Sequence, residues 1–282
     1  MRFDLKEILS DADQRGYAVP AFNFSDSWEL TAILDAAREL QAPVIAASNM
    51  QVVKVHGAEL LGTIFKHYSN AAKTPVIFHL DHSNSPKLCK QMLECGYPSV
   101  MFDGSMLPLE ENIHKSKEIT SYAESFGACV EVEIGRIIGR NEESMYEGEG
   151  YLGTAEDALR LVQESNCGAL AVGLGNAHGF YREKPKLRFE RLAEINDLVD
   201  TPLVLHGGTG IPEEDIQKAI KNGINKVNVG TELHFTYLST LQGRLHEDPF
   251  EPNVINHMED VVEKVKEPVK KWIRICMAEN KA

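Results

Sequence analysis

Three histidines follow short apolar runs of this chain. His82 comes directly after PVIFHLD, His178 lies in GNAHG, and His206 lies in LVLHGG. A single histidine in such a place usually serves as a hydrogen-bonding residue. Three of them, two followed directly by glycine, favour a metal site, because three neutral imidazoles and one open position are typical of catalytic zinc. We therefore expect His82, His178 and His206 to bind Zn²⁺.

Asp81 directly precedes His82 in the sequence HLDH. Consecutive residues of a strand face opposite sides, but the chain turns where a strand ends, so both side chains can reach one site. A carboxylate beside a metal-bound hydroxy-ketone can accept the proton of a substrate hydroxyl. Orientation of a metal-binding imidazole is the alternative role. We interpret Asp81 as a catalytic, proton-transferring residue.

Glu131 and Glu133 lie two positions apart in VEVEIG and share one face of a predicted strand. Two carboxylates that point into a protein interior are costly unless they are paired or bound to a cation. Glu133 is nearer to the end of the strand, and we expect it to bind or support the metal. We expect the deeper Glu131 to be structural.

Two glycine-containing segments, HGGTG (206–210) and NVGTE (228–232), follow the last two predicted strands. Loops in this position of a barrel often bind phosphate through backbone N–H groups and a helix N-terminus. Thr209 and Thr231 add hydroxyl donors, and Asn228 adds an amide. Either segment alone could be an ordinary helix cap, but together they predict a phosphate site. The chain has no P-loop motif, so nucleotide binding through such a loop has no support.

Eight short apolar runs, most of them nearly continuous, alternate with helical stretches. Such runs are typical of parallel strands that are buried on both faces. We expect an α/β protein with a closed (β/α)8 TIM barrel in a single domain (1–282), whose strand ends bring the histidines to one rim. An open doubly wound sheet is the alternative. The runs cover residues 17–23, 43–48, 75–81, 99–104, 129–134, 169–175, 202–208 and 226–230.

The connection at about 135–153 is long, polar and rich in glycine. Connections of this length are usually functional or mobile, so we expect a mobile active-site loop there. From about residue 232 the pattern is helical to the end and predicts C-terminal helices that complete the outer shell.

The charge balance is acidic, with 42 Asp and Glu against 29 Lys and Arg and a formal net charge of −13. This composition opposes binding to nucleic acid or to an anionic membrane. We recognise no signal peptide and no apolar stretch long enough for a membrane helix. Five scattered cysteines without a CxxC pair indicate reduced thiols, so we expect a cytoplasmic enzyme.

Seven segments carry a family resemblance along nearly the whole chain. The order of these segments resembles that in the class II, metal-dependent ketose-bisphosphate aldolases, which include the fructose- and tagatose-bisphosphate enzymes. The resemblance implies reversible cleavage of a phosphorylated ketose to dihydroxyacetone phosphate and an aldehyde. It also implies Zn²⁺, allows a monovalent cation near the phosphate, and predicts a homodimer or homotetramer. The segments are AVPAFNF, HLDH, SVMFDGS, VEVEIG, GNAHGFY, LVLHGGTGIP and KVNVGTEL.

The resemblance also assigns roles to residues. The three histidines match the zinc ligands, Asp81 matches the proton-transferring aspartate, and Glu133 matches a glutamate at or beside the metal. The positions that match substrate-binding residues are Asn23, Ser48, Gly179, Gly207, Gly208, Thr209, Asn228, Gly230 and Thr231.

Two departures from the family pattern bear on the reaction. The loop after the fifth strand reads IIGRNEES, so its catalytic acid is Glu142 or Glu143. Where this chain has Gly230, fructose-bisphosphate enzymes often have Asp or Asn, whereas tagatose-type enzymes often have a small residue. This difference disfavours a simple fructose-bisphosphate assignment and leaves a different phosphorylated ketose open.

Three other functions fit parts of the pattern. A Schiff-base aldolase needs a lysine that projects into the site, but ALAVGLG has none and Lys226 opens the last predicted strand, at the wrong end of the barrel. A zinc barrel that binds a sugar phosphate without turnover is opposed by Asp81 and the acidic loop. An isomerase or epimerase would use the same residues. The site residues therefore do not separate these reactions, and carbon–carbon cleavage is implied only by the family resemblance.

Overall fold

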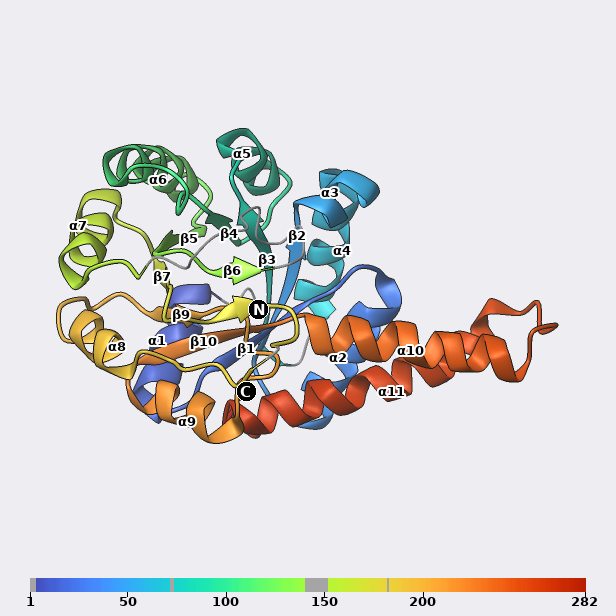
Figure 1. Cartoon of the computed structure of the whole chain (residues 1–282). Helices are drawn as coiled ribbons and strands as arrows, with labels where there is room; N and C mark the ends of the chain where they lie inside the picture. The colour runs from blue at the N-terminus through green and yellow to red at the C-terminus, as the bar shows by residue number, and fades with distance from the viewer. Residues whose placement is uncertain (1–3, 72–73, 140–151, 182) are drawn as a thin grey trace.

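The computed structural model of the chain describes residues 4–71, 74–139, 152–181 and 183–282. Eight parallel strands close into a barrel in the order β1-β10-β9-β7-β5-β4-β3-β2, and helices surround it (Figure 1). The predicted TIM barrel is therefore confirmed, and the open-sheet alternative is wrong. The barrel strands are β1 (Val19–Asn23), β2 (Val44–Asn49), β3 (Val76–Ser83), β4 (Ser99–Phe102), β5 (Cys129–Ile134), β7 (Ala169–Val172), β9 (Leu203–Leu205) and β10 (Ile224–Val229).

Several helices are preceded by a residue whose side chain accepts hydrogen bonds from the free backbone N–H groups of the first helical turn. Asp26 serves this purpose before α2, and Ser85 does so before α5. The helices are α1 (Leu5–Arg15), α2 (Ser27–Glu39), α3 (Met50–His56), α4 (Ala58–Ala71), α5 (Pro86–Glu94), α6 (Leu109–Glu124), α7 (Ala155–Ser165), α8 (Phe189–Asn196), α9 (Glu213–Lys221), α10 (Thr231–Glu247) and α11 (Val254–Ile275).

Polar side chains occupy the barrel interior below the strand ends. Alternate residues of a strand face the same side, so β3, β5 and β10 each place two polar residues inside, all of them buried. Hydrogen bonds cross the interior from Lys226 to Glu131 and from Asn228 to Asp81. The deeper three residues are His79, Glu131 and Lys226, and the three nearer to the strand ends are Asp81, Glu133 and Asn228.

Two short strands lie outside the barrel. β6 (Ile138–Gly139) and β8 (Ala177–His178) pair in parallel, with Gly139 opposite His178. We had expected His178 at the end of a barrel strand, and this expectation is wrong. The barrel strand β7 already ends at Val172. A strand of two residues leaves no apolar pattern that could predict it. Glu142, Glu143 and the predicted mobile part of the loop (140–151) lie outside the described residues.

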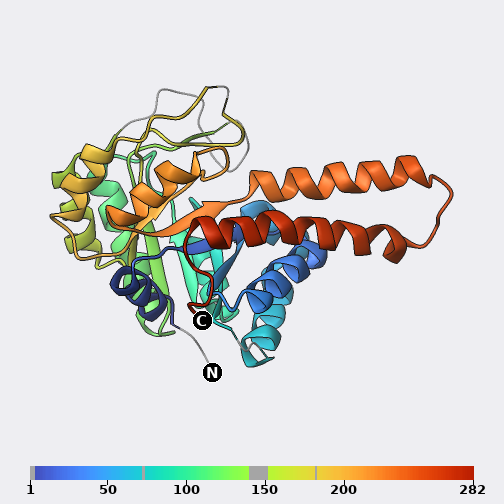
Figure 2. The ribbon, with the colours of Figure 1, turned by 90° about the horizontal axis from the view of Figure 1, so that it is seen from below.

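The last two helices form a hairpin that projects beyond the barrel, which we call the arm (Figure 2). α10 begins at Thr231, close to the predicted start of the C-terminal helices, and α11 returns beside it to the barrel. α11 packs against α2. Within the described part of the chain, no helix is long and apolar enough to cross a membrane.

Candidate active site

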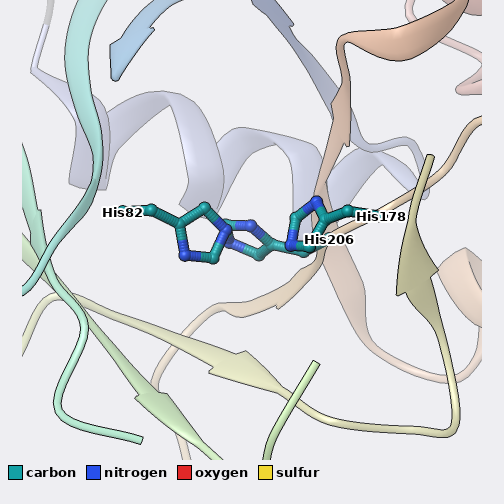
Figure 3. Close-up of side chains that lie close together, drawn as sticks. All are labelled: His82, His178 and His206. Carbon is teal, nitrogen blue, oxygen red and sulfur yellow. The ribbon is translucent and has the colours of Figure 1, made fainter. Parts of the chain in front are cut away.

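The three predicted metal-binding histidines converge at one rim of the barrel (Figure 3). His82 comes from β3, His178 from β8, and His206 from the end of β9. The centre of the His82 ring lies 4.8 Å from that of His178 and 4.5 Å from that of His206. One nitrogen from each ring lies within 4.8 Å of the other two. This spacing brings three potential ligand atoms around one point.

Hydrogen bonds determine which nitrogen of two rings is available. His82 Nδ1 lies 3.0 Å from Asp103 Oδ2, and His206 Nε2 lies 2.8 Å from Glu131 Oε1, so each of these nitrogens carries the donated proton. Among the described residues, Nε2 of His82 and Nε2 of His178 are buried without a hydrogen-bond partner. Buried polar atoms normally have partners. These free nitrogens therefore fit a metal ion that three imidazoles would share.

Charges around His82 favour a cation. Burial lowers the pKa of His82, but Asp81 and Asp103 outweigh it and raise the pKa to about 10. Burial lowers the pKa of both His178 and His206, which keeps these imidazoles neutral, as metal ligands must be. A divalent cation among the rings would lie where the carboxylates favour positive charge.

Asp81 lies beside the histidines and is held by two amides. Asn23 Nδ2 donates to Asp81 Oδ2 at 2.8 Å, and Asn228 Nδ2 donates to Asp81 Oδ1 at 3.0 Å. Burial raises the pKa of Asp81, but the neighbouring His82 and His206 outweigh this effect and hold the pKa well below its usual range. The carboxylate is therefore ionised, as a proton acceptor must be.

Glu133 lies near Nδ1 of the His82 ring. Its Oε2 is 3.9 Å from His82 Nδ1, and the structure groups Glu133 with His82 and Asp103 rather than with the other two histidines. Burial and the nearby Asp103 raise the pKa of Glu133 well above its usual range. The sequence reasoning missed Asp103, although this acidic residue lies near the end of the run SVMFDG, as Asp81 lies at the end of PVIFHLD.

Local backbone conformation places the histidines. His82 has φ of 43°, in the left-handed region that a non-glycine residue adopts only when its surroundings enforce it. The Tyr181 hydroxyl accepts from Ala177 N at 2.8 Å and donates to Gly207 O at 3.1 Å. Tyr181 thereby ties the segment that carries His178 to the loop that follows His206.

A small pocket opens beside the histidines. Seven of the nine predicted substrate-binding positions line it, together with Asp81 and His178. The N-terminus of α10 borders the pocket at Gly230 and has no side-chain cap, while Thr209 Oγ1 accepts from Glu232 N at 3.3 Å. A helix N-terminus of this kind attracts an anion. The lining residues are Asn23, Asp81, His178, Gly179, Gly207, Thr209, Asn228, Gly230 and Thr231.

Two predicted substrate-binding residues lie elsewhere. Ser48 pairs with Leu80 across β2 and β3, whereas Asn49 lies opposite Asp81, so Ser48 does not share the inward face of Asp81. Its hydroxyl is buried 3.1 Å from Tyr97 Oη. Gly208 N donates to the carbonyl of Asn228 at 2.9 Å, so this residue joins the loop after β9 to β10 instead of lining the pocket.

Solved structures resemble this chain over its whole length. The YdjI aldolase from Escherichia coli K12 is 31% identical, with full coverage of both chains and a TM-score of 0.88. A structure from Coccidioides immitis, assigned as a fructose-1,6-bisphosphate aldolase, is 27% identical over 98% of this chain and 97% of that one, with a TM-score of 0.91. The fructose-bisphosphate aldolase of Campylobacter jejuni is 20% identical over 99% and 95%, with a TM-score of 0.83, and shows the shared fold.

The sequence itself matches one family model. The model, which describes fructose-bisphosphate aldolase class II, matches residues 3–281 and therefore includes the barrel and the arm. The matched range includes every residue of the candidate site described above. The chain belongs to the class II fructose-bisphosphate aldolase family.

Proposed function

We propose that this enzyme cleaves a phosphorylated ketose reversibly to dihydroxyacetone phosphate and an aldehyde, with Zn²⁺ held by His82, His178 and His206. The convergence of three imidazoles beside an ionised Asp81 is the observation that carries this proposal. A bound Zn²⁺ would act as a Lewis acid and stabilise the negative charge that develops on the substrate oxygens during cleavage.

Asp81 would accept the proton of the C4 hydroxyl as the C3–C4 bond breaks. Asn23 and Asn228 hold its two oxygens in place, so the carboxylate needs little reorganisation. Asn228 Oδ1 is buried without a hydrogen-bond partner among the described residues, and it could accept from a substrate hydroxyl. Glu142 or Glu143 would then supply the proton to C3. Gly139, three positions before Glu142, lies opposite His178.

The phosphate of the ketose would occupy the pocket beside α10. Its described lining contains no lysine or arginine, so Thr209, Thr231 and the helix N-terminus would bind the phosphate through hydroxyl and N–H groups. This lack of positive charge in the lining also supports a monovalent cation there. Glu133 would support the site from beside His82.

Gly230 bears on the choice of ketose. A Cβ at this position would lie 3.1–3.3 Å from the Asn23 side chain, so glycine leaves room next to the residue that holds Asp81. A larger residue would have to push Asn23 aside. The preference for a small residue at this position supports a substrate other than fructose 1,6-bisphosphate, such as its C4 epimer tagatose 1,6-bisphosphate or a different ketose 1-phosphate.

The arm supports the expected homo-oligomer, with a second copy of this chain as the partner. Phe235, Leu238 and Leu245 are exposed on one face of α10, and Leu238 retains 63% of its accessible surface. Phe180, two residues after His178, extends this apolar stripe, because its ring lies 5.4 Å from that of Phe235. Two identical stripes can face each other across a twofold axis. The arm projects beyond the barrel, so a second barrel has room to approach (Figure 2).

Release of dihydroxyacetone phosphate tests the proposed reaction. We would assay fructose 1,6-bisphosphate, tagatose 1,6-bisphosphate and other ketose 1-phosphates, with chelator and after Zn²⁺ is returned. We expect cleavage of at least one ketose that is lost with chelator and restored by Zn²⁺. Cleavage that survives complete removal of metal would contradict the zinc site. A protein that binds zinc stoichiometrically but cleaves no ketose would be a sugar-phosphate binder instead.

A further inference from the structure

A buried ion pair lies directly below the three histidines. Lys226 Nζ, from β10, donates to Glu131 Oε2, from β5, at 2.7 Å across the barrel interior. Both side chains are fully buried. The pair is linked to the metal site, because the other oxygen of Glu131 accepts from His206 Nε2 at 2.8 Å.

Two independent contacts agree on the tautomer of His206. The bond to Glu131 requires the proton on Nε2, because a carboxylate only accepts. On the other side of the ring, Asn228 Nδ2 lies 3.3 Å from His206 Nδ1. An amide nitrogen only donates, so Nδ1 carries no proton. His206 therefore carries its lone pair on Nδ1, on the side of the ring away from Glu131, where Asn228 Nδ2 contacts it.

The ion pair needs an explanation beyond stability. Barrel interiors are usually filled with Val, Ile and Leu. Removing two charges from water costs several kcal/mol per ion, and apolar replacements of buried ion pairs are often neutral or stabilising. An apolar pair at these positions would fill the interior but could not accept the proton of His206. This difference favours a role at the metal site.

His79 shows why Glu131 alone is not enough. Its Nε2 lies 3.7 Å from Glu131 Oε2, the same oxygen that Lys226 binds, and has no hydrogen-bond partner among the described residues. Without the lysine, the carboxylate could turn toward His79 and away from His206. Lys226 therefore fixes the carboxylate in the orientation that serves His206.

We infer that Lys226 is a positioning residue for the metal site: it holds Glu131, which holds His206 in the tautomer that offers Nδ1 to the ion. The inference rests on the proposed zinc function and extends it to a residue that touches neither metal nor substrate. Outer partners of metal-binding histidines commonly change metal affinity by about 10- to 100-fold.

The test measures metal binding instead of turnover. We would compare the wild type with Lys226→Met, Glu131→Gln and the double variant, using competition with a chromophoric chelator for the Kd of Zn²⁺ and the visible spectrum of bound Co²⁺. We expect each single variant to bind Zn²⁺ about 10- to 100-fold more weakly and to change the Co²⁺ spectrum. The double variant should bind no more weakly than Glu131→Gln, because Lys226 acts through Glu131.

Lys266→Met is the matched control. Lys266 is also largely buried and paired with a carboxylate, Glu39, at 2.6 Å, but it lies on α11 outside the barrel. Its loss should lower the melting temperature and leave the Kd of Zn²⁺ unchanged. If Lys226→Met does not fold, the double variant removes both charges and is compared with Glu131→Gln and the wild type.

Wild-type Zn²⁺ affinity and Co²⁺ spectrum in folded Lys226→Met, or in the double variant, would overturn the inference and leave the proposed reaction intact. Additive losses in the double variant would also overturn it, because Lys226 would then act independently of Glu131. If the wild type itself binds no Zn²⁺, the proposed function has failed instead.

Discussion

Asn23 donates its side-chain amide to Asp81 Oδ2 across 2.8 Å. The two residues come from β1 and β3, which are separated in the barrel by β2. With Asn228 on the other oxygen, both acceptors of the carboxylate are directed before substrate arrives. The residue that we propose to move the proton is therefore held in place by two others.

We expect Asp81→Ala to keep zinc and lose most cleavage. The three histidines remain, but no group accepts the hydroxyl proton, and general-base catalysis typically contributes about 10²- to 10⁴-fold. Steady-state release of dihydroxyacetone phosphate, together with zinc content by atomic absorption, would check this. Turnover near the wild-type rate would show that another residue is the base.

Asn23→Ala should reduce kcat less than Asp81→Ala does. One of the two hydrogen bonds to the carboxylate is lost, and a bond to a charged group contributes about 1.5–3 kcal/mol, which corresponds to roughly 10- to 150-fold in rate. Asn228 still holds the other oxygen. The comparison uses kcat for both variants on one preparation of substrate. A loss as large as that of Asp81→Ala would mean that Asn23 has a direct role in the reaction.

Gly207→Ala should weaken zinc binding and lower the melting temperature. Gly207 has φ of 65°, and an added Cβ would collide with the carbonyl oxygen of Ala177, next to His178. The loops that carry His178 and His206 would have to separate. Gly179→Ala is the control, because Gly179 has φ of 89° but open space around a Cβ, so only backbone strain of about 1–2 kcal/mol applies. Equal effects on the Kd of Zn²⁺ would contradict the collision argument.

The eight barrel strands could be predicted from the sequence because each is a short apolar run buried on both faces. The partners of the site could not. His178 lies on a two-residue strand, and the contacts of Lys226 with Glu131 and of Asp103 with His82 join residues far apart in sequence. We had placed Lys226 at the wrong end of the barrel for catalysis. Its side chain does not line the pocket, but it reaches Glu131, which hydrogen-bonds His206.

Glu39 should make stability depend on pH in acid. Hydrogen bonds from Lys266 and Lys270 lower the pKa of Glu39 to about 2. A lowered pKa in the folded state stabilises the protein above the unfolded pKa of about 4.5, and this contribution disappears as the pH falls toward 2. The melting temperature of Glu39→Gln should therefore lie below that of the wild type at pH 6 and converge with it near pH 2. A constant difference across this range would contradict the assignment.

Charge on the arm should separate the proposed oligomer. Leu238 is the most exposed of the three apolar residues on α10, so Leu238→Glu would place a carboxylate in the centre of a contact between two copies, where it would lose water without gaining a partner. We expect the wild type to be a dimer or tetramer at micromolar concentration by light scattering, and the variant to have a lower mass. Gly243→Glu adds the same charge on another side of α10, where an added Cβ meets no neighbouring atom, and should keep the wild-type mass. A monomeric wild type, or equal dissociation of both variants, would contradict an interface on this face.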